Sequence, residues 1–312
     1  MRPRHAVMLA LLSGVWGASY LLIAEAIEEI PESLVVLART GLAALALLAV
    51  ILVRGGEAAR LLAGARRRPG TAFLLGAFAI ALPFMLITFG ERTVPSGLSA
   101  VLIASAPIFI AILAPFLDRS EIMSPVQWAG LAVGIAGVGL LVGVEQIGSP
   151  GELLGALAMI GAAASYAVSG FILKRRYPGV PPIVTTFLAV AASAVLVVPA
   201  AAAQPPDDAP GPVAVLAVLA LALIGTAWAF VVYFRLIAEI GYGRASVVAY
   251  TIPPVALAYG WALRDESISA ATIVGTLLIL VGVFLVARGR RVVSRRSIPA
   301  NPPLPQRTDT LT

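Results

Sequence analysis

The stretch LSAVLIASAPIFIAILAPFL, residues 98–117, contains no charged side chain. A helix needs about 20 mostly apolar residues to cross the hydrocarbon core of a bilayer, so this stretch predicts a membrane-spanning helix. It lacks the alternation of apolar and polar residues that is typical of a membrane β-barrel strand. Nine further runs have similar length and character: 6–27, 34–53, 71–90, 126–144, 153–173, 183–203, 213–234, 245–263 and 267–287.

The composition of the whole chain agrees with this pattern. Hydrophobic residues make up 60% of the 312 residues and charged residues only 12%, against roughly a quarter charged in an ordinary soluble domain. A soluble protein of this length still needs a polar surface. The predicted fold class is therefore an all-α polytopic membrane protein with ten transmembrane helices.

Two residue types that carry much of protein chemistry are nearly absent. The chain has no cysteine, and its single histidine, His5, precedes the first apolar run. We therefore expect no thiolate metal site, no disulfide and no histidine chemistry inside the membrane. No cofactor, metal site or catalytic residue is predicted.

Lys and Arg residues are distributed unevenly over the connections between the runs. Nineteen of the 22 basic residues fall in segments on the same side as the amino terminus. Only Arg92 and Arg264 fall in segments on the other side, and Arg39 lies inside a run. Because basic connections stay in the cytoplasm, we predict a multi-pass protein of the cytoplasmic (inner) membrane with both termini in the cytoplasm. The net charge of +6 then needs no nucleic-acid partner.

The first run has an alternative interpretation as a cleavable signal peptide. It has a basic start, an apolar stretch and the sequence Ala24-Glu25-Ala26, which resembles a cleavage site. The apolar stretch is as long as a full span, and its removal would break the internal repeat described next. Both features favour a retained helix.

The two halves of the chain resemble each other. Residues 100–107, AVLIASAP, match residues 246–253, SVVAYTIP, so that Pro107 corresponds to Pro253. Each half contains five runs, and an odd number places the second copy in the opposite orientation. Inverted repeats are typical of secondary transporters, whose substrate site lies near the midplane between the repeats. The predicted domains are 1–144 and 145–287 as the two inverted five-helix repeats, and 288–312 as a disordered, basic and Pro-rich cytoplasmic tail.

A series of short motifs runs along the chain: Trp16-Gly17-Ala18-Ser19-Tyr20, Arg39, the stretch ending in Pro107, Glu121, Gln127-Trp128-Ala129-Gly130, Gly137-Val138, Pro253-Pro254, Asp265-Glu266, Gly275 and Gly282. In these residues the sequence resembles the EamA family of the drug/metabolite transporter superfamily over nearly its whole length. The resemblance implies ten helices around a central cavity and the movement of small solutes, often as export of metabolites, amino acids or drugs. Two positions depart from the pattern: Ala24 and Glu25 replace a lysine common in this family, and Ser165-Tyr166 stand where a tryptophan is common.

Two prolines near mid-membrane indicate where a binding site would lie. Pro107 and Pro253 occupy corresponding places in the two repeats, and paired helix interruptions of this kind point to the binding region of a transporter. The alternative is a kink that serves helix packing alone. The predicted substrate cavity consists of Trp16, Tyr20, Ser105, Pro107, Tyr166, Ser169, Trp228, Tyr250, Thr251 and Pro253.

Charged residues within the runs are a second class of candidates, because such charges are costly in a membrane. Glu25 and Arg39 lie at similar depth near the outer ends of the first two runs. We therefore predict that they form an ion pair or gate; the alternative is a purely structural pair with a snorkelling arginine. Glu91 and Glu239 lie at run ends and are expected to be solvated.

Glycines in the fifth run are relevant to whether the chain forms a dimer. Gly130-x-x-x-Gly134 and Gly139-x-x-x-Gly143 allow helices to approach closely. We assign this contact to packing within one chain, and a homodimer has no further support in the sequence. The expected partners are a small-molecule substrate and the lipid bilayer.

These observations favour a secondary transporter that moves a small metabolite by alternating access, with export implied by the resemblance. The expected solute is amino-acid-like or drug-like, is neutral, zwitterionic or cationic, and carries no phosphate. The chain has no P-loop, so no ATPase subunit is implied. A passive channel or facilitator is the second hypothesis. An intramembrane enzyme is the third, and no HExxH, GxSxG or aspartate-rich motif supports it.

Overall fold

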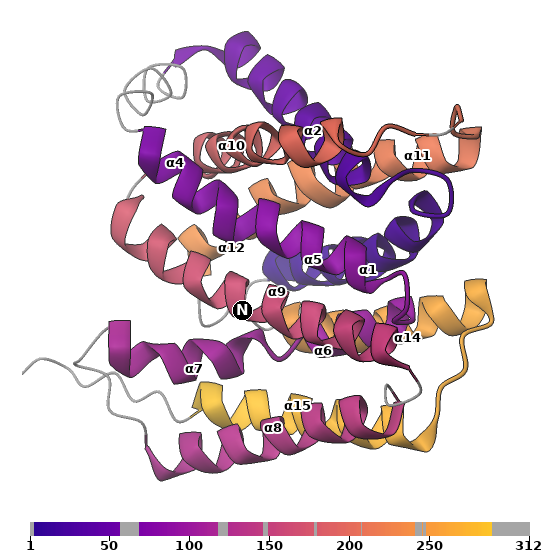
Figure 1. Ribbon diagram of the computed structural model, residues 1–312. Helices are drawn as coiled ribbons and strands as arrows, with labels where there is room; N and C mark the ends of the chain where they lie inside the picture. The colour runs from indigo at the N-terminus through magenta and orange to yellow at the C-terminus, as the bar shows by residue number, and fades with distance from the viewer. Residues whose placement is uncertain are drawn as a thin grey trace, which may run out of the picture.

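The computed structural model describes residues 3–56, 69–117, 124–145, 149–177, 180–206, 208–240, 245 and 248–288 (Figure 1). All regular structure within these residues is helical, which confirms the predicted all-α fold. Eight of the described helices are long and apolar enough to cross a membrane, and Ala270–Val286 forms a shorter apolar helix. The predicted tail lies outside the described residues beyond Arg288.

The described residues form ten long helical rods. The first five are α1 (Pro3–Ala26), α2 (Glu32–Arg54), the rod of α4 (Pro69–Gly76), η1 (Ala77–Ala81) and α5 (Leu82–Gly90), the rod of α6 (Ser96–Ile103) and α7 (Ala106–Leu117), and α8 (Pro125–Glu145). The second five are α9 (Pro150–Arg176), α10 (Pro182–Ala202), the rod of α11 (Pro212–Ala220), η2 (Leu221–Trp228) and α12 (Ala229–Ile240), then α14 (Val248–Arg264) and α15 (Ala270–Arg288).

Local sequence explains where many rods begin. Proline is the first residue of α8, α9, α10 and α11, a position where its missing N–H costs no helical hydrogen bond. The eighth predicted run differs most from the structure, because α12 continues to Ile240 instead of ending at 234. Arg235 Nε donates to Glu239 Oε1 at 2.8 Å, an i,i+4 pair that stabilises the additional helical turn.

The fourth rod is interrupted next to a proline. Helix α6 ends at Ile103 and α7 begins at Ala106, because Pro107 has no N–H to donate and its ring collides with the carbonyl four residues earlier. The Ser105 hydroxyl donates to the Leu102 carbonyl at 2.6 Å. In the corresponding rod, Pro253 lies inside α14.

The packing of the rods follows the internal repeat. Helix α8 packs against α15, and α2 packs against α10, so that corresponding rods meet each other. Helix α1 packs against α14 and the α11–η2 rod, whereas its counterpart α9 packs against α7 and α5. Each of these two helices thus contacts the corresponding rods of the opposite half. Figure 1 shows the α8–α15 pair along one edge of the molecule and the α2–α10 pair along the opposite edge.

Close contact between α8 and α15 depends on glycine. A Cβ added to Gly130 would lie 2.7 Å from the Gly282 carbonyl oxygen, and one added to Gly137 would lie 2.9 Å from the Gly275 carbonyl oxygen. Gly139, by contrast, has no atom within 4 Å of such a Cβ. Gly130 and Gly137 thus serve contact within the chain, whereas the GxxxG pattern had pointed to Gly139 in place of Gly137.

The third and eighth rods both contain a π-helical segment. Segment η1 lies in the middle of the third rod and η2 in the middle of the eighth, at corresponding positions of the two repeats. A wider π turn leaves backbone groups without their usual i−4 partners and is often found at functional sites. The pair of π segments is therefore a second symmetric interruption besides the two prolines.

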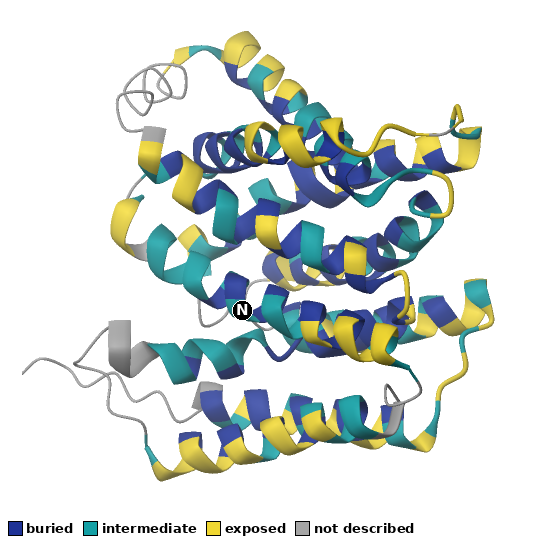
Figure 2. Cartoon of the chain, in the orientation of Figure 1, coloured by how far each residue is buried: buried dark blue, intermediate teal, exposed yellow. Residues whose placement is uncertain are grey.

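The outer surface of the bundle is apolar. Figure 2 shows many exposed residues on the outward faces of the rods; among them Val53 is 87% exposed, and Leu216 and Trp261 are each 64% exposed. Exposed apolar side chains on this scale would aggregate in water but suit contact with lipid. Trp128, 59% exposed near the start of α8, fits an aromatic anchor at the membrane surface.

Candidate substrate cavity and the polar clusters at its two ends

A cavity of about 280 Å³ lies inside the bundle. Its walls come from both repeats and are mostly apolar and aromatic. Eight aromatic side chains line it, together with the guanidinium-bearing side chain of Arg39 and the small residues Ser19 and Ser169: Trp16, Tyr20, Phe84, Tyr166, Phe230, Tyr233, Phe234 and Tyr250.

The structure brings most of the predicted cavity residues together. Trp16, Tyr20, Pro107, Tyr166, Ser169 and Tyr250 all line the cavity.

Four predicted cavity residues lie outside the lining. Trp228 is 39% exposed on the surface of the bundle. Ser105 is buried and bonded within its own turn. Thr251 shares a hydrogen bond with the Ser13 hydroxyl, and Pro253 is buried in α14. These four side chains point into helix contacts or outward. The sequence could not show this, because the depth of a residue in the membrane does not give the rotation of its helix about the helix axis.

An aromatic wall forms where α1 meets the eighth rod. The Trp16 ring makes edge contacts with Phe230 at 5.7 Å and with Tyr233 at 5.1 Å between centroids. Trp16 Nε1 also donates to the Gly225 carbonyl at 3.2 Å. Gly225 belongs to η2, so a carbonyl of the π segment holds the tryptophan in place. Phe230, Tyr233 and Phe234 were missed by the sequence reasoning, although their i, i+3, i+4 spacing on one helix face was a usable signal.

Among the described residues, Arg39 is the one charged side chain in the lining of the cavity. It is only 4% exposed, its Nε donates to the Thr226 hydroxyl at 2.7 Å, and its Cζ lies 3.9 Å from the centre of the Phe84 ring. A hydrogen bond and a cation–π contact together offset part of the cost of burying the charge. Among the described residues, the two terminal nitrogens of Arg39 have no hydrogen-bond partner.

The predicted pair between Glu25 and Arg39 is wrong. Glu25 instead binds Arg264, whose Nη1 lies 2.8 Å from the Glu25 carboxylate, and Arg264 also reaches Glu28 at 2.6 Å. The depth of the two residues along their helices is similar, as predicted. Arg39, however, lies on the α2 face that packs against η2, whereas Glu25 faces α14.

We call the end of the bundle that holds Glu25 and Arg264 the outer end, and the opposite end the inner end. At the outer end Glu266 accepts hydrogen bonds from the backbone N–H of Ser96 and of Gly97, each at 2.9 Å, and from the Ser96 hydroxyl at 2.6 Å. A carboxylate is favoured there because the amino terminus of α6 carries partial positive charge. Glu266 thereby joins the second repeat to the first. Its predicted counterpart Glu121 lies outside the described residues.

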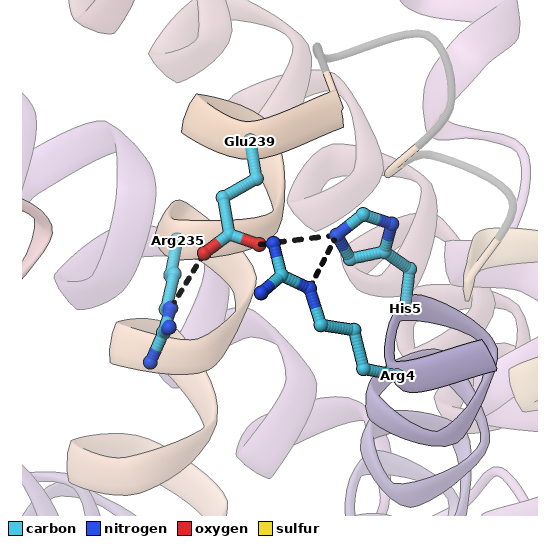
Figure 3. A network of polar contacts seen from close by, with 4 residues as sticks. All are labelled: Arg4, His5, Arg235 and Glu239. Carbon is cyan, nitrogen blue, oxygen red and sulfur yellow. Dashed lines mark hydrogen bonds and ion pairs between the residues drawn. The ribbon is translucent and has the colours of Figure 1, made fainter. Parts of the chain in front are cut away.

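At the inner end, Glu239 joins the eighth rod to α1. Its carboxylate binds Arg4 at 3.2 Å, His5 at 3.1 Å and Arg235 at 2.8 Å (Figure 3). His5 lies within α1 and is 6% exposed. Glu239 is exposed, as expected for a glutamate near a run end, and three basic side chains also converge on it.

Glu91, by contrast, differs from its expected solvated state. It follows α5 directly at the outer end and is only 7% exposed. A position at a helix end does not guarantee solvation, because neighbouring rods can extend past that end.

Comparison with known proteins gives a family match over most of the chain. The model of the EamA-like transporter family matches twice, at residues 4–143 and at residues 153–288. The two matches correspond to the two halves of five rods each.

Several curated relatives match over most of their length. The "Uncharacterized transporter YoaV" of Bacillus subtilis is 26% identical, covering 89% of this chain and 96% of the relative. The "Uncharacterized inner membrane transporter YedA" of Escherichia coli K12 is 28% identical, covering 96% and 95%. The "Probable terminal-alkyne amino-acid exporter" of Streptantibioticus cattleyicolor is 29% identical, covering 73% and 76%. A solved crystal structure that is 21% identical shares the fold, with a TM-score of 0.64 and coverage of 92% and 99%.

Proposed function

The chain belongs to the EamA-like transporter family, and on this basis we propose that it exports a small amino-acid-like solute across the cytoplasmic membrane by alternating access. The solute is zwitterionic or cationic, or a drug-like molecule of similar size. The name of the Streptantibioticus relative, an amino-acid exporter, supports both the solute class and the direction.

The observation that carries the solute class is a single arginine in an aromatic cavity. The free terminal nitrogens of Arg39 suit a carboxylate, which binds a guanidinium through charge-assisted hydrogen bonds. The aromatic wall around Trp16 and Tyr233 offers ring faces to an ammonium group or an apolar side chain. A zwitterion with an apolar side chain uses both features at once.

The size of the cavity favours a small solute. Its volume of about 280 Å³ lies just below the roughly 300–1,000 Å³ of pockets for drug-sized ligands. A phosphorylated solute fits less well, because phosphate recognition favours several converging basic groups. Arg39 is the only basic residue that the described part of the chain contributes to the lining.

The arrangement of polar clusters supports alternating access. Arg264 and Glu266 tie rods together at the outer end, and Glu239 ties α1 to α12 at the inner end. The cavity lies between these clusters. Ion pairs that break and form again at either end would allow the two inverted repeats to exchange conformations.

Counterflow in proteoliposomes tests the proposal. Purified protein would be reconstituted with a concentrated unlabelled neutral amino acid inside, and uptake of radiolabelled amino acid would be followed over a panel of zwitterionic, cationic and phosphorylated solutes. We expect saturable counterflow for at least one zwitterionic or cationic member, and its loss in Arg39→Gln for carboxylate-bearing solutes. Flux that neither saturates nor shows counterflow would establish the passive channel instead. Preferred transport of a phosphorylated solute would overturn the solute class.

A further inference from the structure

Glu91 differs from the other described carboxylates at the outer end. It is 7% exposed, and neither carboxylate oxygen has a hydrogen-bond partner among the described residues. Five other described glutamates near this end have a donor or a basic partner: Glu25, Glu28, Glu29, Glu32 and Glu266. Glu152 at the start of α9 is less buried than Glu91.

An ionised carboxylate is unstable in such a place. Burying a charge without a partner costs several kcal/mol, and a buried group avoids this cost by becoming neutral. Glu91 also caps the carboxyl end of α5, where the helix dipole disfavours negative charge. Both effects favour the protonated acid while the outer end has the conformation described here.

The charged and titratable groups around Glu91 come from several rods. Burial and the nearby Glu266 raise the pKa of Glu91 well above its usual value, whereas Arg39 of α2 and Arg264 of α14 oppose this. The backbone N–H of Ala24 is also close enough to oppose it, but without the geometry of a hydrogen bond. Tyr20 of α1, which lines the cavity, is also coupled electrostatically to Glu91. The two arginines thus act on Glu91, but each already binds another group.

We propose that Glu91 is a proton-binding site and that closing the outer end takes up one proton onto its carboxylate. The proposal rests on the alternating-access function proposed above. In the step, one carboxylate oxygen of Glu91 forms an O–H bond with a proton from the outer solution. When the outer end opens, water reaches the carboxyl group, which releases the proton to the same solution. The pH of the outer solution would thereby bias whether the outer end is open or closed.

The direction of the pH effect follows from the linkage between proton binding and conformation. In an open outer end, a solvated Glu91 has the usual pKa of about 4.3. In the structure described here, whose outer end we take as closed because Arg264 and Glu266 join its rods, the pKa of Glu91 is raised. The closed end therefore has its full stability below the pKa of the open state. It loses stability as the pH rises toward the pKa of the closed state, by up to about tenfold in the closed-to-open ratio per pH unit.

Thiol labelling can measure this equilibrium without any knowledge of the solute. The chain has no cysteine, so Ile23→Cys places one thiol in the cavity, three residues before the outer end of α1. A membrane-impermeant thiol reagent would be added to cells between pH 5 and pH 8. The labelling rate would be compared in the Glu91 and Glu91→Gln backgrounds, so that titration of the thiol itself cancels in the ratio.

In the expected result, Glu91→Gln mimics the protonated acid and keeps the outer end closed at every pH. The ratio of labelling rates, Glu91 over Gln, should then rise with pH by up to about tenfold per unit. Glu152→Gln makes the same chemical change at a half-buried glutamate of α9 and should keep the pH dependence of the unsubstituted background. A ratio that stays constant across this range would overturn the proposal.

Infrared difference spectroscopy of the purified protein provides a second measurement that does not require the variant to behave normally. The native protein at neutral pH should show the C=O stretch of a protonated carboxyl group, and this band should be absent from Glu91→Gln. Its absence from the native protein would overturn the proton site. Because neither measurement uses a solute, failure here leaves the counterflow result intact, and absence of transport leaves this test intact.

Discussion

The hydrogen bond between Arg39 and Thr226 should set the affinity for a carboxylate-bearing solute. Thr226→Val keeps the size of the side chain but removes the hydroxyl that accepts from Arg39 Nε at 2.7 Å. Hydrogen bonds to charged groups contribute about 1.5–3 kcal/mol. Arg39 is only 4% exposed, so water cannot easily replace the lost partner. If the bond holds the guanidinium in its binding orientation, the apparent KM should rise roughly ten- to hundredfold, since 1.4 kcal/mol corresponds to tenfold.

The assay is saturable counterflow in proteoliposomes, combined with the unfolding temperature of the purified protein in detergent. Thr226→Ser retains a hydroxyl and should stay within a few-fold of the native protein. Thr88→Val is the matched control, because Thr88 is equally buried but bonds only the Phe84 carbonyl of its own helix. The reasoning fails if Thr226→Val and Thr88→Val have the same KM and the same unfolding temperature.

Three further predictions concern the bundle as a whole. A double-mutant cycle of Glu25→Gln and Arg264→Gln should give a coupling of up to about 1 kcal/mol in unfolding measurements, the range for partly exposed pairs; zero coupling would show that the 2.8 Å contact does not contribute. Gly130→Ala should destabilise the protein by about 1–3 kcal/mol through overpacking, measured by unfolding in detergent, whereas Gly139→Ala, which has nothing within 4 Å, should be neutral; equal effects would contradict the helix contact. Reporter domains inserted in the loop 204–211 and fused to the carboxyl terminus should report opposite sides of the membrane, and a signal from the same side would refute the ten-span topology.

Much of the fold could be predicted from the sequence because the membrane imposes a simple rule on each span. Apolar length, proline at the first helical position and the alternation of basic connections all act locally. The starts of the predicted runs 126–144 and 213–234 consequently lie within one residue of the starts of α8 and α11. The end of α12 was less predictable, because the pair Arg235–Glu239 continues the helix beyond its apolar run.

The candidate cavity was predictable in part. Corresponding prolines and nearby aromatic residues pointed to the middle of the bundle, where Trp16, Tyr166 and Tyr250 do line a cavity. Trp228 was assigned to the same cavity but lies at the surface. Pattern and composition locate a residue along its helix. Whether its side chain faces a cavity, a neighbouring helix or lipid depends on how the helix is rotated about its own axis.

The sequence by itself determined the number, order and depth of the spans, since each residue of a helix advances about 1.5 Å along an axis that the bilayer aligns. Only the tertiary structure decided which charges meet. Glu25 and Arg39 lie at similar depth but bind Arg264 and Thr226 on different rods, and Glu91 at a helix end is enclosed by its neighbours. Such pairings depend on the rotation of each helix and on contacts between residues far apart in the chain, which the packing of all the rods decides together.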